Sequence, residues 1–382
     1  MEYKKYKKCL WTLLAIVCGL LFTAICLTIG SNRQSEKQKT IASAKTVPSD
    51  ATLSQNEPTH SKWENQSETH MVIPCGYPIG VYVKTEGVMV IDTGCFLAKD
   101  SSMQSPCENI LKQGDYITSI NGVKVQDKHD LIEMVSSCEG HVLEVGIIRD
   151  LVPMKVKIVP KQNENGTYML GLWVKDDISG IGTLTYVDEN GFGALGHSIN
   201  DNDTGEIFHI SDGAIYDAKL LRIVKADGKQ AGRLEGVIDY KKECMLGRVE
   251  TNESLGIKGY LTENGKSRLL AGNWMEIAKR EEVHEGEAQL LSWVSGNAEY
   301  YDIKIVDVFS NKASSNEKDG MSKSIEIQIT DQNLLDLTSG IVQGLSGTPI
   351  IQDGKLVGAV THVFLKDSTK GYGVFAEDMI YN

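Results

Sequence analysis

The feature that most constrains this chain is an almost wholly apolar run from Leu10 to Ile29. A helix of about 20 residues is about 30 Å long, which matches the hydrocarbon thickness of a bilayer. Lysines crowd the nine residues before the run, and a positively charged flank stays on the cytoplasmic side. We therefore expect a cytoplasmic N-terminus over residues 1–9 and a transmembrane anchor over residues 10–30, with the remainder outside the cytoplasm.

A cleavable signal peptide is the alternative to an anchor. Its apolar core is usually shorter, about 7–15 residues, and a small-residue cleavage site follows it. The sequence shows no clear Ala-x-Ala site after the run, which favours the anchor. Residues 31–70 are rich in Ser, Thr, Gln, Asn and Lys and lack apolar periodicity, so they are predicted to form a flexible stalk.

Composition narrows the function classes further. The net charge of −12 argues against nucleic acid as a partner, because phosphate binding needs a basic surface. The sequence contains neither an HExxH pair nor a phosphate-binding glycine loop, so no metal or cofactor is expected. Cysteines beyond residue 70 show no CxxC spacing and are interpreted as small buried side chains, with a Cys95–Cys107 bridge left open.

Residues 71–160 show short strands and one helix. Strands are predicted at 79–84, 88–91 and 116–120, a tight turn at Asn121-Gly122 and an amphipathic helix over 130–137. The stretch from Leu111 to Val125, LKQGDYITSINGVKV, resembles a PDZ domain. That resemblance implies a groove that binds an extended peptide or partner by strand addition. The segment assigned to the groove is Gly76, Tyr77, Pro78, Ile79, Gly80 and Val81.

Residues 165–382 are rich in strands and turns and show no long helical periodicity, so a β-barrel or sandwich is expected. They contain Gly344-Leu-Ser346-Gly-Thr-Pro-Ile350, followed by a predicted hairpin. A serine between glycines on a tight turn exposes its hydroxyl and frees backbone N–H groups for an oxyanion. Ser346 is thus the candidate nucleophile, with the N–H groups of Gly344 and Ser346 as the oxyanion hole.

A serine nucleophile needs a base, and His197 is the leading candidate. It lies in Gly193-Ala-Leu-Gly-His-Ser198, where small neighbours would present the ring at a turn. His362 lies on the strand predicted after the nucleophile. In a trypsin-like barrel that strand lines the specificity pocket, so Thr361, His362 and Val363 are the candidate pocket wall.

Four segments of the chain together resemble the SpoIVB-type peptidases, a family named for stage IV sporulation protein B. They are GIGTLTY at 180–186, GALGHS at 193–198, GIVQGLSGTPI at 340–350 and GAVTHV at 358–363. The resemblance implies a trypsin-fold double β-barrel, with His197 as base, Ser346 as nucleophile and Asp331 at the third position. The chain departs from the family at Leu345 and Thr348, where Met and Ser are common.

The resemblance also implies a biological role. Such peptidases of endospore-forming bacteria are exported from the forespore into the space between its two membranes. There they cleave a regulator of an intramembrane protease complex, which activates the late mother-cell sigma factor, and some process themselves. The sequence thus predicts a mainly β, membrane-anchored serine endopeptidase whose partners are a protein substrate, a peptide ligand and the membrane.

Two alternatives stay open at this stage. Asp331 lies close to Ser346 along the chain for a trypsin-fold acid, and Asp239 is the alternative by position. If Asp331 fixes the tautomer of the base, Asp331→Asn should lower turnover by orders of magnitude. The alternative function is a catalytically idle envelope scaffold that combines a PDZ-like domain with a barrel.

Overall fold

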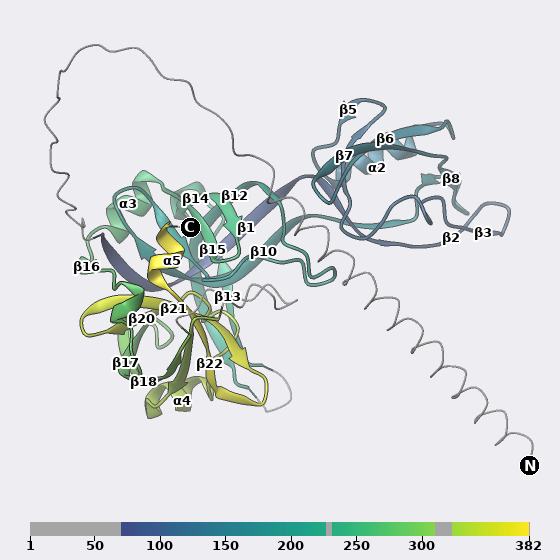
Figure 1. The fold of residues 1–382 in the computed structure, drawn as a ribbon. Coiled ribbons are helices and arrows are strands. Elements are labelled where there is room, and N and C mark those ends of the chain that lie inside the picture. The colour runs from purple at the N-terminus through teal and green to yellow at the C-terminus, as the bar shows by residue number, and fades with distance from the viewer. Residues whose placement is uncertain (1–69, 227–230, 310–322, 382) are drawn as a thin grey trace, which may run out of the picture. The chain divides into compact units, whose positions relative to one another are not determined.

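The computed structural model describes residues 70–226, 231–309 and 323–381, which belong to one unit of the chain, Ser67–Asn382. These residues form mostly strands with a few short helices, so the mainly β prediction is confirmed (Figure 1). The predicted N-terminal segment, anchor and stalk lie outside the described residues. Within the described ranges, no helix combines the length and hydropathy needed to cross a membrane.

The N-terminal barrel is a ring of six strands built on β1 (Met71–Thr93), which pairs with β10 (Leu172–Val187) along most of its length. The ring closes because β12 pairs back onto β1, with Ile79 opposite Asp217. The other strands, in order from β10, are β11 (Phe192–Ala194), β15 (Gly256–Leu261), β14 (Met245–Glu253) and β12 (Ile210–Val224). β13 (Arg233–Ile238) pairs with the second half of β12.

The core of this barrel is filled from every side by large apolar side chains. Ile79, Leu184, Ile215 and Leu246 are fully buried and belong to one cluster. They come from four different strands, and each faces inward because successive residues of a strand point to opposite faces. The barrel therefore holds β1, β10, β12 and β14 in fixed positions.

The C-terminal barrel is a closed ring of six strands. In order they are β17 (Gly286–Ser292), β18 (Glu299–Val308), β19 (Ile325–Ile329), β22 (Asp367–Phe375), β21 (Lys355–Phe364) and β20 (Pro349–Gln352). In β19 the buried isoleucines at 325, 327 and 329 alternate with partly exposed Glu326 and Gln328. This period of two is what a strand with one face on a core requires.

Short elements complete the two barrels. α4 (Gln332–Thr338) follows β19, and α5 (Ala376–Tyr381) follows β22. The remaining ones are η1 (Lys242–Cys244), α3 (Glu263–Leu269), β16 (Met275–Glu276) and η2 (Arg280–Glu282).

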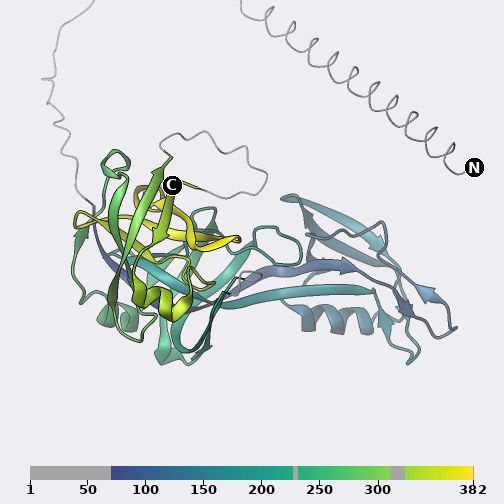
Figure 2. The same cartoon turned by 90° about the horizontal axis from the view of Figure 1, so that it is seen from below.

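The PDZ-like domain is inserted between β1 and β10. Its sheet continues from β1 through β4 (Tyr116–Ile120), β6 (Leu143–Arg149) and β7 (Val152–Ile158), and α2 (Lys128–Ser136) lies beside it (Figure 2). Asp127 caps α2, because its side chain accepts hydrogen bonds from the N–H groups of His129 and Asp130. The shorter strands are β2 (Phe96–Leu97), β3 (Met103–Gln104), β5 (Val123–Lys124), β8 (Lys161–Gln162) and β9 (Tyr168–Met169).

Several local predictions in this domain agree with the structure. The predicted strand at 116–120 is β4, and the predicted helix at 130–137 begins two residues earlier and ends one residue earlier. Asn121 and Gly122 have φ values of +50° and +80°, as the predicted tight turn requires. Cys107 is a buried thiol and Cys95 an exposed one, so this structure contains no bridge between them.

The structure departs from the sequence prediction at the boundary between the two domains. The predicted groove segment, Gly76–Val81, lies in β1 and belongs to the N-terminal barrel. Ile79 pairs with Gly182 on one side and Asp217 on the other, so neither edge is free to receive a peptide. The prediction failed because β1 continues from the barrel into the PDZ-like sheet, and nothing in its local pattern marks the crossing.

Candidate active site

The predicted nucleophile lies on the loop that enters β20. Gly344 and Gly347 on either side of Ser346 have φ values of +100° and +93°, where side chains other than glycine are strained. A Cβ on Gly347 would lie 2.3 Å from the Thr183 oxygen and 2.6 Å from the Leu195 nitrogen. The loop therefore packs directly against β10 and the residue that follows β11 in the N-terminal barrel.

The same contact brings the candidate base toward the nucleophile. His197 follows β11, and a Cβ on the preceding Gly196 would lie 3.0 Å from Cγ2 of Thr361. The His197 ring centroid is 5.2 Å from that of His362, the next residue of β21. Segments near 197 and 346, far apart along the chain, thus both contact β21.

Each of the two candidate groups is hydrogen-bonded to a main-chain oxygen. Ser346 Oγ donates to the Thr361 oxygen at 2.8 Å, and His197 Nδ1 donates to the Ser198 oxygen at 2.8 Å. Among the described residues, no hydrogen bond joins Ser346 to His197. Burial lowers the pKa of His197, and the bond to Ser198 partly opposes this shift. The base is therefore neutral near pH 7.

His362 is the second imidazole of the site. Burial, together with smaller contributions from the nearby His197 and Lys323, lowers its pKa to about 4. Its Nδ1 is buried and has no hydrogen-bond partner within the described part of the chain. At neutral pH His362 is thus an uncharged ring beside the candidate base.

The two N–H groups assigned to the oxyanion hole are not used elsewhere in the described structure. The N–H groups of Gly344 and Ser346 make no hydrogen bond among the described residues, while Leu345, Gly347 and Thr348 all donate within the protein. Thr183 supports this loop from β10, because its Oγ1 donates to the Gly344 oxygen at 2.6 Å and its N–H donates to the Ser346 oxygen at 3.3 Å. Thr183 lies in the GIGTLTY motif, but nothing in the motif itself indicates this role.

A second support comes from β13. The Gln343 N–H donates to the Gly232 oxygen and the Gln343 oxygen accepts from the Leu234 N–H, both at 2.8 Å. The side chain of Leu234 packs so closely on Gly344 that an added Cβ would lie 3.1 Å away. The sequence carries no local signal for this contact, since it joins a hairpin of one barrel to a loop of the other.

The candidate acids lie in other surroundings. Asp331 is the N-cap of α4: its carboxylate accepts from the Leu334 N–H at 3.0 Å and from the Asp302 N–H at 3.4 Å. Asp239 is exposed and paired with Lys241. Neither is hydrogen-bonded to His197 in the described structure.

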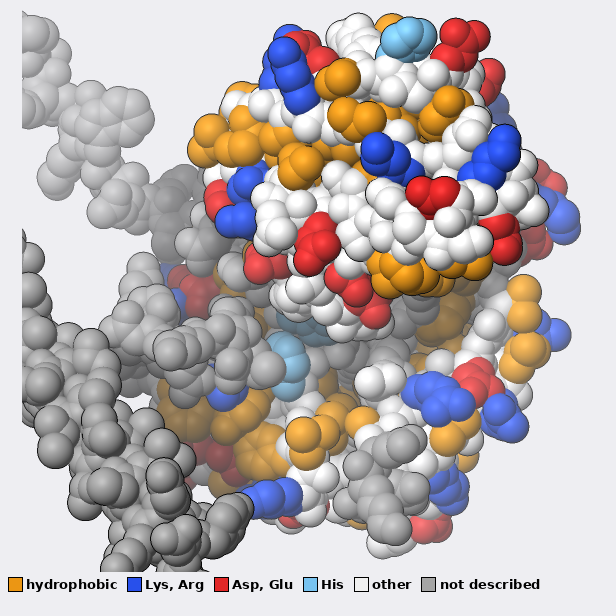
Figure 3. Space-filling view, turned by 90° about the vertical axis from the view of Figure 1, so that its right-hand side faces the viewer, with side chains coloured by type: hydrophobic (Ala, Val, Ile, Leu, Met, Phe, Trp, Pro, Cys, Tyr) orange, Lys and Arg blue, Asp and Glu red, His pale blue; other side chains and the backbone are white. Residues whose placement is uncertain are grey.

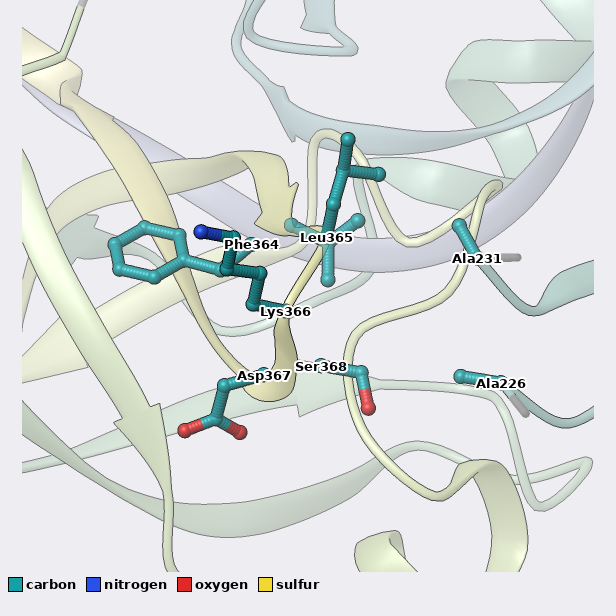
Figure 4. A pocket seen from close by; sticks show the side chains of 8 residues that line it. Ala226, Ala231, Phe364, Leu365, Lys366, Asp367 and Ser368 are labelled. Atoms are coloured by element: carbon teal, nitrogen blue, oxygen red, sulfur yellow. The ribbon is translucent and has the colours of Figure 1, made fainter. Parts of the chain in front are cut away.

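A pocket of about 180 Å³ lies next to the predicted pocket wall on β21. Val363 contributes to it, and Figure 4 shows Ala226 and Ala231 across from the turn that carries Leu365 and Lys366. The full lining is Ala226, Ala231, Val363, Phe364, Leu365, Lys366, Asp367 and Ser368. Thr361 and His362 lie beside the candidate catalytic pair instead.

A family model described as SpoIVB peptidase S55 matches residues 166–380 of this chain. The chain belongs to this family. The match covers the three motifs that contain His197, Ser346 and His362, so the resemblance inferred from the sequence is confirmed. A SpoIVB-family protein with this barrel architecture is a serine peptidase of sporulation.

Solved structures add weaker likenesses for this SpoIVB-family chain. The PDZ domain of the SdrC-like protein from Listeria monocytogenes is 22% identical to this chain. The match covers 24% of this chain and 90% of that domain's chain, with a TM-score of 0.20. The Rv3671c protease of M. tuberculosis, in an inactive form, is 12% identical and covers 52% of this chain and 80% of its own, with a TM-score of 0.24. Its Ser343Ala mutant matches equally, with 77% of that chain covered.

Proposed function

We propose that this protein is a membrane-anchored, trypsin-like serine endopeptidase in which Ser346 attacks the substrate and His197 is the base. One observation carries the proposal: the loop of Ser346 and the turn of His197 meet on β21, with two unused N–H donors beside the serine. Acyl transfer needs such a combination of nucleophile, neutral base and preorganised donors.

The chemistry requires one small movement. Rotation about the Cα–Cβ bond of Ser346 would release its hydroxyl from Thr361 and direct it to Nε2 of His197. Catalytic hydrogen bonds are often long or misaligned without substrate and form in the complex. Nε2 would then take the hydroxyl proton as Oγ adds to the scissile carbonyl, and the N–H groups of Gly344 and Ser346 would bind the resulting oxyanion.

A fluorophosphonate probe tests this function on the full chain in detergent. We expect covalent label on Ser346, no label on Ser346→Ala and slow labelling of His197→Gln. Ser136→Ala, an exposed serine in the PDZ-like domain, is the matched control and should label normally. Label that persists in Ser346→Ala would contradict the assignment.

An idle scaffold is the second candidate function. It is favoured by the hydrogen bond from Ser346 to Thr361, which engages the hydroxyl with a main-chain oxygen and not with the base. Failure of the wild-type protein to react with the probe, while it still binds a peptide, would establish this alternative.

The proposed substrate is a protein outside the cytoplasm, a regulator of an intramembrane protease complex whose cleavage leads to late sigma-factor activation. The predicted anchor at 10–30 and the family membership support this proposal. Mixing active protein with the Ser346→Ala chain would reveal self-cleavage in trans through new N-termini. The same mapping on envelope proteins would identify the substrate, and an absence of any new N-terminus would count against the role.

The PDZ-like domain is proposed to bind an extended peptide beside α2. The first residues of β10, Leu172–Lys175, pair with β1 on one edge, and no described strand occupies the other edge, next to α2. Trp173 on this segment is 69% exposed. Figure 3 shows hydrophobic side chains gathered in patches among charged groups on the face of the molecule that it presents. Strand addition would use the free edge for main-chain hydrogen bonds.

Photo-crosslinking tests this groove. A benzoylphenylalanine at position 173 should crosslink to the bound peptide or substrate. The same group at Leu151, which is 74% exposed on the turn between β6 and β7, is the control and should crosslink weakly. Equal crosslinking from both positions would argue against the groove.

A further inference from the structure

Asn252 is tied to the candidate base through a single peptide unit. His197 Nδ1 binds the Ser198 oxygen at 2.8 Å, and a carbonyl oxygen can accept but not donate. Nδ1 therefore carries the proton in this arrangement, and Nε2 keeps its lone pair. The N–H of the same peptide unit, that of Ile199, donates to Asn252 Oδ1 at 2.7 Å.

The amide of Asn252 is fully used in this contact. Its Nδ2 donates to the Ile199 oxygen and to the Phe208 oxygen, each at 2.9 Å. A flipped amide would place Oδ1 against two carbonyl oxygens, so the hydrogen-bond pattern fixes its orientation. Asn252 therefore holds the Ser198–Ile199 peptide in one plane, with the carbonyl aimed at His197.

We propose that Asn252, acting through the Ser198–Ile199 peptide, is a positioning residue that holds His197 in its catalytic tautomer. The proposal rests on the proposed peptidase function. A carboxylate in the Ser-His-Asp arrangement performs the same task, since it holds the proton on Nδ1 and orients the ring. Hydrogen bonds in series polarise one another, so the bond at Ile199 strengthens the acceptor at Ser198.

Two further observations favour this role for Asn252. Among the described residues, no carboxylate contacts His197, and Asp331 is engaged as a helix cap. Asn252 lies on β14, a strand of the barrel that carries His197, and the order His197, Asn252, Ser346 keeps base, orienting group and nucleophile in sequence. A rigid barrel strand holds such a group more precisely than a loop does.

The test compares three variants in the full chain, with fluorophosphonate labelling resolved into probe affinity and maximal rate. For Asn252→Ala we expect the maximal rate to fall by about tenfold or more with unchanged probe affinity, because the ring samples the wrong tautomer. Asn200→Ala is the matched control: it loosens the same loop, where Asn200 bonds Ser198 Oγ and the Gly205 oxygen, but leaves the peptide unit alone. Asn200→Ala should label at the wild-type rate.

Nitrogen NMR of histidine-labelled protein gives a readout that loop loosening alone would not move. In the wild type the His197 signals should show a proton on Nδ1, and in Asn252→Ala a mixture of tautomers. If Asn252→Ala does not fold, Asn252→Ser, whose side chain is too short to span the same contacts, replaces it. A wild-type His197 protonated on Nε2, or an Asn252 variant with normal rate and tautomer, would overturn the proposal.

The outcomes distinguish a failure of the Asn252 role from a failure of the proposed peptidase function. If Ser346→Ala still labels, the peptidase assignment fails. If Ser346→Ala is silent and Asp331→Asn loses its rate together with the Nδ1 tautomer, the peptidase stands and Asp331, not Asn252, is the orienting group.

Discussion

The Ser346 hydroxyl donates a hydrogen bond to the main-chain oxygen of Thr361 at 2.8 Å. Thr361 precedes His362, whose ring adjoins His197, so one strand of the C-terminal barrel touches both candidate catalytic groups. The bond is a single neutral one at a partly exposed site, and such bonds contribute about 1 kcal/mol.

Replacing the nucleophile should therefore separate activity from stability. Ser346→Ala is expected to abolish peptide hydrolysis while lowering the free energy of unfolding by about 1 kcal/mol or less. Hydrolysis of a casein substrate and thermal unfolding would check the two parts. A large loss of stability would show that Ser346 has a structural role beyond the bond to Thr361.

Thr183 and Thr185 on β10 form a matched pair for testing support of the oxyanion loop. Thr183→Val removes the bond to the Gly344 oxygen and should lower kcat about tenfold, with a loss of about 1 kcal/mol in stability. Thr185 Oγ1 is buried without a partner among the described residues, so Thr185→Val should be neutral or stabilising and leave kcat unchanged. Equal kcat for both variants would refute a role for the Thr183 hydroxyl.

Asp331 should affect stability more than catalysis. Asp331→Ala removes the N-cap of α4 and should lower the free energy of unfolding by about 1 kcal/mol, whereas Asp331→Asn keeps a capping oxygen and should cost little. Chemical denaturation of both variants gives the comparison. The family resemblance implies instead that Asp331→Asn loses turnover. A stable Asp331→Asn protein with strongly reduced turnover would support that catalytic role.

The buried histidines should make stability depend on pH. The pKa of His362 falls from 6.5 to about 4 on folding, so the unfolded chain binds the proton more tightly. The contribution of His362 to the free energy of unfolding is complete above pH 6.5 and is lost as the pH falls from 6.5 toward 4. His197, whose pKa is also lowered, acts in the same direction.

A neutral variant should expose this contribution. His362→Gln is expected to unfold with a flatter dependence on pH between 6.5 and 4 than the wild type, measured by thermal unfolding across that range. His141→Gln, an exposed histidine of the PDZ-like domain, is the control and should leave the curve unchanged. Parallel curves for wild type and His362→Gln would show that His362 does not carry the effect.

The sequence by itself determined the local features: the nucleophile loop with its glycines, the turn of His197, the tight turn at Asn121-Gly122 and the β-strand periodicity. These follow from backbone preferences and side-chain alternation, which act over a few residues. Tertiary structure alone decided that β1 belongs to two domains, that Asp331 caps a helix and that Asn252 and Thr183 reach the site. Such relationships depend on which distant strands pair, and a strand's own residues do not specify its partner or what lies across the barrel.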